Sequence, residues 1–186
     1  MKPSTLLPAL ITLGIMGHPM AQAETHAPHV HGEADLAIIM NGDQISAHLT
    51  SAMYNITGFE HAPETTAQQD RLASAIATLD SPDTLFEFTA SAACRSTSVH
   101  HSLQAEAGRE TSPHGHDGKE GSQHRDLVAE YAFTCEHPSR LRSVTVHMFA
   151  SFKNLERINA IVFLGDEQIA PEVTPDAPTI SLPPLR

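Results

Sequence analysis

The chain has 186 residues and a formal net charge of −11, and its 13 histidines outnumber its 11 lysines and arginines together. The length fits one ordinary domain, and a hydrophobic content of 40% supplies a core, which argues against wholesale disorder. The acidic balance argues against nucleic acid or an anionic membrane surface as the main partner, and the absence of Trp argues against a base-stacking surface. The histidine excess points instead to metal ions, because imidazole is the commonest protein ligand of zinc-type ions.

The first 23 residues have the features of a secretory signal peptide. Lys2 precedes an apolar stretch over 6–17, and Ala21-Gln22-Ala23 supplies the small residues of a cleavage site. The stretch is shorter than the roughly 20 residues that span a bilayer. We expect cleavage after Ala23 and an exported mature chain, 24–186, without a membrane span. An uncleaved anchor is the alternative.

The first half of the mature chain predicts a hairpin followed by a helix. Apolar and polar residues alternate on either side of Asn41-Gly42, a dipeptide typical of two-residue hairpin turns. The period then changes to that of a helix, with Leu72, Ile76 and Leu79 on one face. The predicted elements are a strand over 34–40, a strand over 44–50, a helix over 63–79 and a strand over 84–92.

Two cysteines flank the most unusual segment. In an oxidising compartment, Cys94 and Cys135 most simply form one disulfide, and two metal-binding thiolates are the alternative. Residues 96–125 between them lack apolar periodicity and are rich in Gly, Ser and His, so we predict a flexible His-rich insert there. The histidines of this insert are His100, His101, His114, His116 and His124.

The second half of the chain continues with alternating patterns. These predict strands over 127–135, 143–148, 157–164 and 168–173, one helical turn within 149–155, and a proline-rich tail along the surface. The fold class expected from the whole pattern is α+β. We predict a single domain over 24–186, with a mostly antiparallel β-sheet of about six strands, at least one helix and the long His-rich loop.

The segment before the hairpin has the spacing of a metal chelate. On an extended chain, His29 and His31 point to the same side, and Glu33 adds a hard ligand or a hydrogen-bond acceptor. Zinc prefers four ligands in a tetrahedron, so at least one further ligand must come from elsewhere. The alternative is a ragged terminus with scattered histidines.

Further candidate ligands lie at changes of chain direction. His61 precedes the predicted helix, and His137 stands two residues after Cys135, where a disulfide would hold it rigidly. The alternative for each of these two histidines is a solvated loop residue that binds no metal. The insert histidines suit weak capture of several metal ions. The alternative is an insertion without function, which a fold tolerates because closing a longer loop costs little entropy. We interpret His48 and His147, on outward strand faces, as solvated.

Five features together resemble the ZrgA-like family of periplasmic zinc-uptake-associated, His-rich proteins over essentially the whole mature chain. They are His-x-His-Gly-x-Ala-x-Leu over 29–36, Asn41-Gly42, Gly58-Phe59-Glu60-His61-Ala62-Pro63, the Cys94/Cys135 pair around a His-rich insert, and Phe149-x-x-Phe152 with Ile158. The resemblance implies a periplasmic Zn²⁺-binding protein that assists a high-affinity importer. It implies His29, His31, Glu60 and His61 as ligands, and the periplasmic binding protein of a zinc ABC importer as a candidate partner.

Two other classes of function stay open. His29-Val30-His31-Gly32, an exported chain and one disulfide together resemble copper/zinc superoxide dismutase, but the later metal-ligand loop of that enzyme has no counterpart here. The sequence also lacks Gly-x-Ser-x-Gly and His-Glu-x-x-His, so we expect no enzyme. The remaining class is an interaction module whose histidines are incidental.

Overall fold

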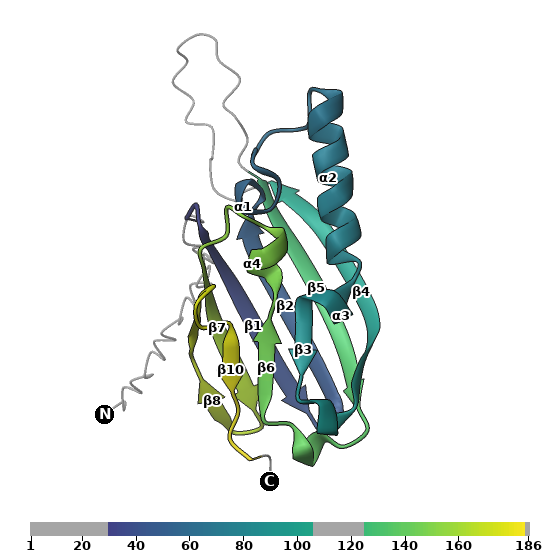
Figure 1. Ribbon diagram of the computed structural model, residues 1–186, viewed down its shortest axis with the longest axis vertical. Helices are drawn as coiled ribbons and strands as arrows, with labels where there is room; N and C mark the ends of the chain where they lie inside the picture. The colour runs from purple at the N-terminus through teal and green to yellow at the C-terminus, as the bar shows by residue number, and fades with distance from the viewer. Residues whose placement is uncertain (1–29, 106–124, 185–186) are drawn as a thin grey trace, which may run out of the picture.

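Two β-sheets face each other across one hydrophobic core in the residues that the computed structural model describes, 30–105 and 125–184 (Figure 1). In spatial order, the seven-stranded sheet contains β4 (Cys94–Ala105), β5 (Arg125–Cys135), β2 (Gln44–Ala52), β1 (Glu33–Asn41), β7 (Arg157–Leu164) and β8 (Glu167–Ile169), with β9 (Glu172–Val173) also paired to β7. The three-stranded sheet contains β10 (Thr179–Ser181), β6 (Ser143–Val146) and β3 (Phe86–Phe88).

The core forms because the strands of the large sheet alternate along their length. In β1, Leu36 and Ile38 are buried while their neighbours point outward, and β2 and β7 repeat this pattern. The inner face packs on the small sheet, where Phe86 makes edge contacts with the rings of Tyr131 and Phe133. The described residues place no second sheet over the opposite face of the large sheet (Figure 1).

The predicted sheet is confirmed in part. The protein is mostly β, but its large sheet is mixed, because β1 and β7 run parallel while the other pairs are antiparallel. The parallel pair joins Glu33 to Arg157, which are far apart in the sequence. Alternation predicts both strands but not their pairing, since period 2 is the same in parallel and antiparallel ladders.

In the described part of the chain, short helices connect the strands, and only one of them has more than five residues. That helix, α2, begins with a capping box in which the Thr65 hydroxyl accepts from the Gln68 N–H at 3.2 Å. No helix among the described residues is long and apolar enough to cross a membrane. The helices are α1 (Met53–Thr57), α2 (Thr66–Leu79), α3 (Pro82–Leu85), η1 (Ala90–Ala92), η2 (Pro138–Arg140) and α4 (Met148–Ser151).

Several predicted boundaries were wrong. Residues 96–105 belong to strand β4, so His100 and His101 lie in the sheet and not in a loop. The pattern failed because β4 is an edge strand whose side chains are mostly polar or partly exposed. The segment 84–92 holds only the short strand β3, between α3 and η1, and the tail includes β10, whose Ile180 is buried. The predicted strand over 168–173 is divided into β8 and β9.

Candidate metal centre

One end of the large sheet brings together His31, Glu60 and His61, three of the candidate ligands that the structure describes. The register pairs Ala34 with Ser51, and Asp126 with both Ala52 and Gln104. The start of β1, the end of β2, the end of β4 and the start of β5 therefore all lie at this end, beside α1 (Figure 1). We call it the ligand end.

A tight turn over Val30–Glu33 positions His31 at the ligand end. Gly32 has φ +86°, a left-handed conformation that disfavours side chains, and a Cβ there would lie 3.3 Å from the Glu156 carboxyl group. Its carbonyl oxygen accepts from the backbone N–H groups of Glu156 and Arg157 at 2.8 and 2.9 Å. The turn is thus fixed to the start of β7, and His31 leaves it in a defined direction.

A second turn brings Glu60 to the same place. Helix α1 ends at Gly58, which has φ +84° and donates its N–H to the Tyr54 carbonyl oxygen at 2.8 Å. Phe59 is then buried, and its carbonyl oxygen lies 2.9 Å from the Thr57 hydroxyl. With the chain anchored on both sides of Gly58, the next residue, Glu60, projects toward His31.

His31 and Glu60 form the central contact of this end. Nε2 of His31 lies 2.5 Å from Oε1 of Glu60, and the His31 ring stacks on Tyr54 with centroids 4.3 Å apart. The Glu60 side chain is 17% exposed and that of His31 is 54% exposed. A carboxylate and an imidazole are therefore held together at the surface, where an ion can reach them.

His61 lies beside this pair in the chain and has its own orientation. Its Nδ1 lies 2.7 Å from the Ala62 carbonyl oxygen, which can only accept, so Nδ1 carries the proton and donates. The lone pair is then on Nε2, the atom that would bind a metal ion. The Phe59 ring lies 5.6 Å from the His61 ring and limits its position.

A buried asparagine that the sequence analysis did not single out joins the two turns. Asn55 is 1% exposed, its Oδ1 accepts from the Gly32 N–H at 2.7 Å, and its Nδ2 donates to the Glu33 carbonyl oxygen at 2.7 Å. The available signal was a polar residue inside the otherwise apolar stretch around Met53 and Ile56. Asn55 is a positioning residue, because it fixes the His31 turn to α1 without reaching the surface.

Glu33 has a structural partner. Its Oε1 lies 2.8 Å from Nη2 of Arg157, whose Nη1 also reaches Glu172 at 3.2 Å. The hydrogen bond to Glu172 and the charge of Glu33 raise the pKa of Arg157. This ion pair joins β1, β7 and β9, and it gives Glu33 an acceptor role.

The other predicted residues are distributed elsewhere. His137 precedes η2 at the opposite end of the sheet, and its N–H donates to the Ala92 carbonyl oxygen at 2.9 Å. His100 and His101 lie on β4, where His101 Nε2 is 3.1 Å from Asp80 Oδ1. The histidines His29, His114, His116 and His124 lie outside the described residues, as does the predicted signal peptide.

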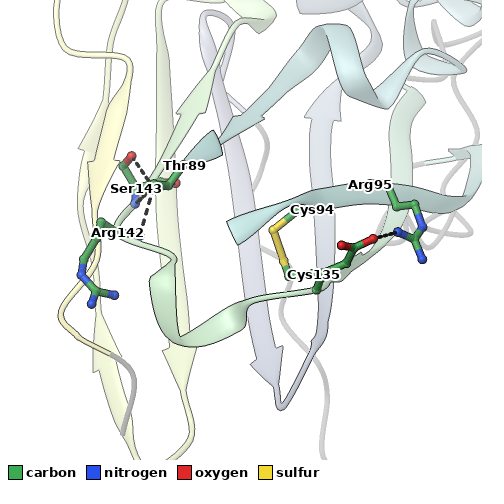
Figure 2. Close-up of a disulfide and its surroundings, with 7 residues drawn as sticks. Thr89, Cys94, Arg95, Cys135, Arg142 and Ser143 are labelled. Atoms are coloured by element: carbon green, nitrogen blue, oxygen red, sulfur yellow. Dashed lines mark hydrogen bonds and ion pairs between the residues drawn. A yellow bond between two sulfur atoms is a disulfide. The ribbon is translucent and has the colours of Figure 1, made fainter. Parts of the chain in front are cut away.

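The predicted disulfide is confirmed. Cys94 and Cys135 are bonded and directly opposite each other in the β4–β5 ladder, next to an ion pair of Arg95 and Glu136 at 2.8 Å (Figure 2). The alternative of two metal-binding thiolates does not agree with this bond. The disulfide closes the end of the sheet farthest from His31.

The two ligand atoms fit a zinc ion after a small movement. In a tetrahedral site with bonds of about 2.0–2.1 Å, two ligand atoms lie about 3.3 Å apart, so His31 Nε2 and Glu60 Oε1 must separate by about 1 Å. Among residues 30–105 and 125–184, no three His, Cys, Asp or Glu side chains already form a metal-binding group. A complete site at this end therefore needs ligands to move in or to come from outside the described residues.

Comparison with known proteins identifies one family. A family model described as "ZrgA family zinc uptake protein" matches residues 28–182. This match includes both turns of the ligand end, the disulfide and the strands of both sheets. A search of curated proteins finds no matching entry.

Proposed function

The chain belongs to the ZrgA family of zinc uptake proteins, and from this premise we propose that it is exported to the periplasm, binds Zn²⁺ there and assists high-affinity zinc import. The proposed role is capture and delivery of the ion, without a catalytic step. The proposed partner is the periplasmic binding protein of a zinc ABC importer.

The contact between His31 and Glu60 carries this proposal. It joins one imidazole nitrogen and one carboxylate, a combination that zinc accepts, on two turns that the fold holds in place. The Glu60 side chain is 17% exposed and that of His31 is 54% exposed, so a sheltered carboxylate lies beside an imidazole that an ion in solution can reach. Candidate ligands nearby in the chain distinguish this pair from a lone surface contact.

The remaining ligands in this proposal come from the neighbouring chain. His61 offers Nε2 from the same turn as Glu60, and His29 stands two residues before His31. Together with His31 and Glu60 they would complete the four ligands that zinc prefers.

The His-rich insert has a supporting role in the proposal. Its two anchors, Ala105 and Arg125, are paired at the ligand end. Histidines tethered there would raise the local concentration of zinc near His31 and Glu60, as linked weak sites do. We assign weak capture to this insert and tight binding to the four-ligand site.

Zinc titration of the mature chain, 24–186, tests the proposal. We compare the wild type with His31→Ala, Glu60→Gln and His137→Ala, using a competing chelator to measure the tightest site. His137 is the matched control, because it is a predicted ligand at the opposite end of the sheet. We expect the first two variants to weaken the tightest site by about tenfold or more, and the control to leave it unchanged.

Three results would contradict the proposal. Unchanged affinity in His31→Ala and Glu60→Gln would remove the site from the ligand end. A wild-type chain without any tight zinc site would favour an interaction module with incidental histidines. Copper-dependent dismutation of superoxide would favour an enzyme like copper/zinc superoxide dismutase.

A further inference from the structure

Two histidines flank one glutamate on the open face of the large sheet, away from the ligand end. The register places Glu130 of β5 opposite His48 of β2 on one side and opposite His100 of β4 on the other. Residues opposite each other in a ladder point to the same face. His48, Glu130 and His100 therefore form one row across three neighbouring strands.

The row is on the solvent side of the sheet. The side chains of His48 and Glu130 are 48% and 60% exposed, and His100 is also exposed. The two neighbours of Glu130 on β5 are Ala129 and Tyr131, and both are buried in the core. The Glu130 side chain therefore points to the other face of the sheet, toward solvent. Rotation of these three side chains costs no core packing.

The three side chains of the row are not yet gathered around one point, so they share an ion only after rotation. His48 Nε2 already lies 3.6 Å from Glu130 Oε1, near the spacing of two ligand atoms on one zinc ion. Opposite side chains have Cβ atoms about 4.5–5.5 Å apart, which puts the two histidine Cβ atoms about 10 Å apart with Glu130 between them. Imidazole rings that lean toward the middle strand can both reach an ion above Glu130.

We propose that His48, Glu130 and His100 form a second divalent-metal site on the face of the sheet, separate from the one at His31 and Glu60. The class of ligand is a zinc-type cation with two imidazoles, one carboxylate and an open position for water. The open position and the exposure make this site weaker and faster in exchange than a closed one.

Another His–Glu pair shows what distinguishes this row. His147 Nε2 lies 2.9 Å from Glu87 Oε2, closer than the contact of His48 with Glu130. The residue opposite Glu87 is Thr145, not a histidine. If a lone His–Glu contact were enough to bind zinc, His147 would bind as well as His48, so this pair is the matched control.

Histidine side-chain NMR of the full mature chain tests the proposal with zinc chloride as the probe. Ring signals are assigned from His48→Ala, His100→Ala and His147→Ala, and the backbone spectrum of each variant confirms that it folds. We expect the His48 and His100 signals to change together as zinc is added. In His48→Ala or Glu130→Gln, the change at His100 should need about tenfold or more zinc, because a shared ion is lost.

The coupling between the two histidines decides the outcome. A His100 response that is the same in the wild type and in His48→Ala would overturn the proposal, since it would mean independent imidazoles. A His147 response at the same zinc concentration as His48 would also overturn it. His31→Ala should leave the His48 and His100 responses unchanged, so failure of the site at His31 and Glu60 remains distinguishable from failure of this one.

Discussion

The side-chain amide of Asn55 connects the turn before β1 to helix α1, because its Oδ1 accepts the Gly32 N–H at 2.7 Å. Its Nδ2 donates in the other direction, to the Glu33 carbonyl oxygen at 2.7 Å and to the Ser51 hydroxyl at 3.1 Å. One buried residue thus determines where His31 lies relative to α1. The geometry of the ligand end depends on a residue that is not itself a candidate ligand.

Replacement of Asn55 by Ala should destabilise the fold and weaken zinc binding together. It removes the partner of the buried Gly32 N–H and a partner of the part-buried Glu33 carbonyl oxygen, and an unpaired buried group costs about 1–3 kcal/mol. Urea unfolding and zinc titration measure the two effects. Asn159→Ala is the control, since this exposed amide lies 3.5 Å from Glu33 and should change neither quantity appreciably. Unaltered zinc affinity in a destabilised Asn55→Ala would contradict the positioning role.

Two glycines with positive φ should respond differently to Ala. Gly32→Ala and Gly42→Ala both impose a left-handed conformation on a residue with a side chain, at about 1–2 kcal/mol. Only at Gly32 does the new Cβ approach another group, the Glu156 carboxyl at 3.3 Å. We expect both variants to lose stability in thermal unfolding and only Gly32→Ala to lose zinc affinity. Equal zinc affinity in the two variants would show that the turn does not position His31.

Deletion of the insert should reduce the number of bound zinc ions without changing the tightest site. Because β4 extends to Ala105 and β5 begins at Arg125, the deletion is limited to 106–124, with a short Gly-Ser linker in its place. A deletion that started at His100 would remove the outer half of β4 and its ladder with β5. Equilibrium dialysis and circular dichroism check the result. Loss of the tightest site would place insert histidines among its ligands.

The stability of the protein should fall at alkaline pH because the buried phenol of Tyr131 resists ionisation in the folded state. This residue is 2% exposed, and its hydroxyl has no hydrogen-bond partner among the described residues. Burial, and secondarily the charge of Asp80, raises the pKa of Tyr131 above its ordinary value of 10.0. The neutral phenol therefore contributes stability below about pH 10, and this contribution is lost as the pH rises further.

Unfolding of the wild type and of Tyr131→Phe between pH 8 and pH 11 measures this contribution. The variant keeps the ring and lacks the titrating hydroxyl, so its stability should fall less steeply above about pH 10. Curves that stay parallel over the whole range would show that Tyr131 is not responsible for the alkaline loss.

The sequence predicts the local elements well where one face is buried. The hairpin around Asn41-Gly42 and the strand over 157–164 follow directly from alternation, and both occur in the structure. Alternation did not predict strand β4, because its Ser, Thr and His side chains lie at a sheet edge, where they need no burial. The parallel pairing of β1 with β7 depends on tertiary contacts that no local pattern contains.

The candidate site was predictable only as separate pieces. His31 and Glu60 each stand out in the sequence, but their contact depends on two turns, and on Asn55, which has no ligand chemistry of its own. The row of His48, Glu130 and His100 needs the strand register, which the sequence does not supply. His137 is the opposite case: its position two residues after Cys135 suggests a ligand, but it lies at the other end of the sheet from His31.

The most direct test of the central claim is a crystal structure of the mature chain grown with Zn²⁺, with anomalous diffraction measured on both sides of the zinc absorption edge. We predict an anomalous peak within about 2.0–2.2 Å of His31 Nε2 and of a Glu60 carboxylate oxygen. A fully occupied zinc ion elsewhere, with His31 and Glu60 still in contact with each other and not with metal, would contradict it.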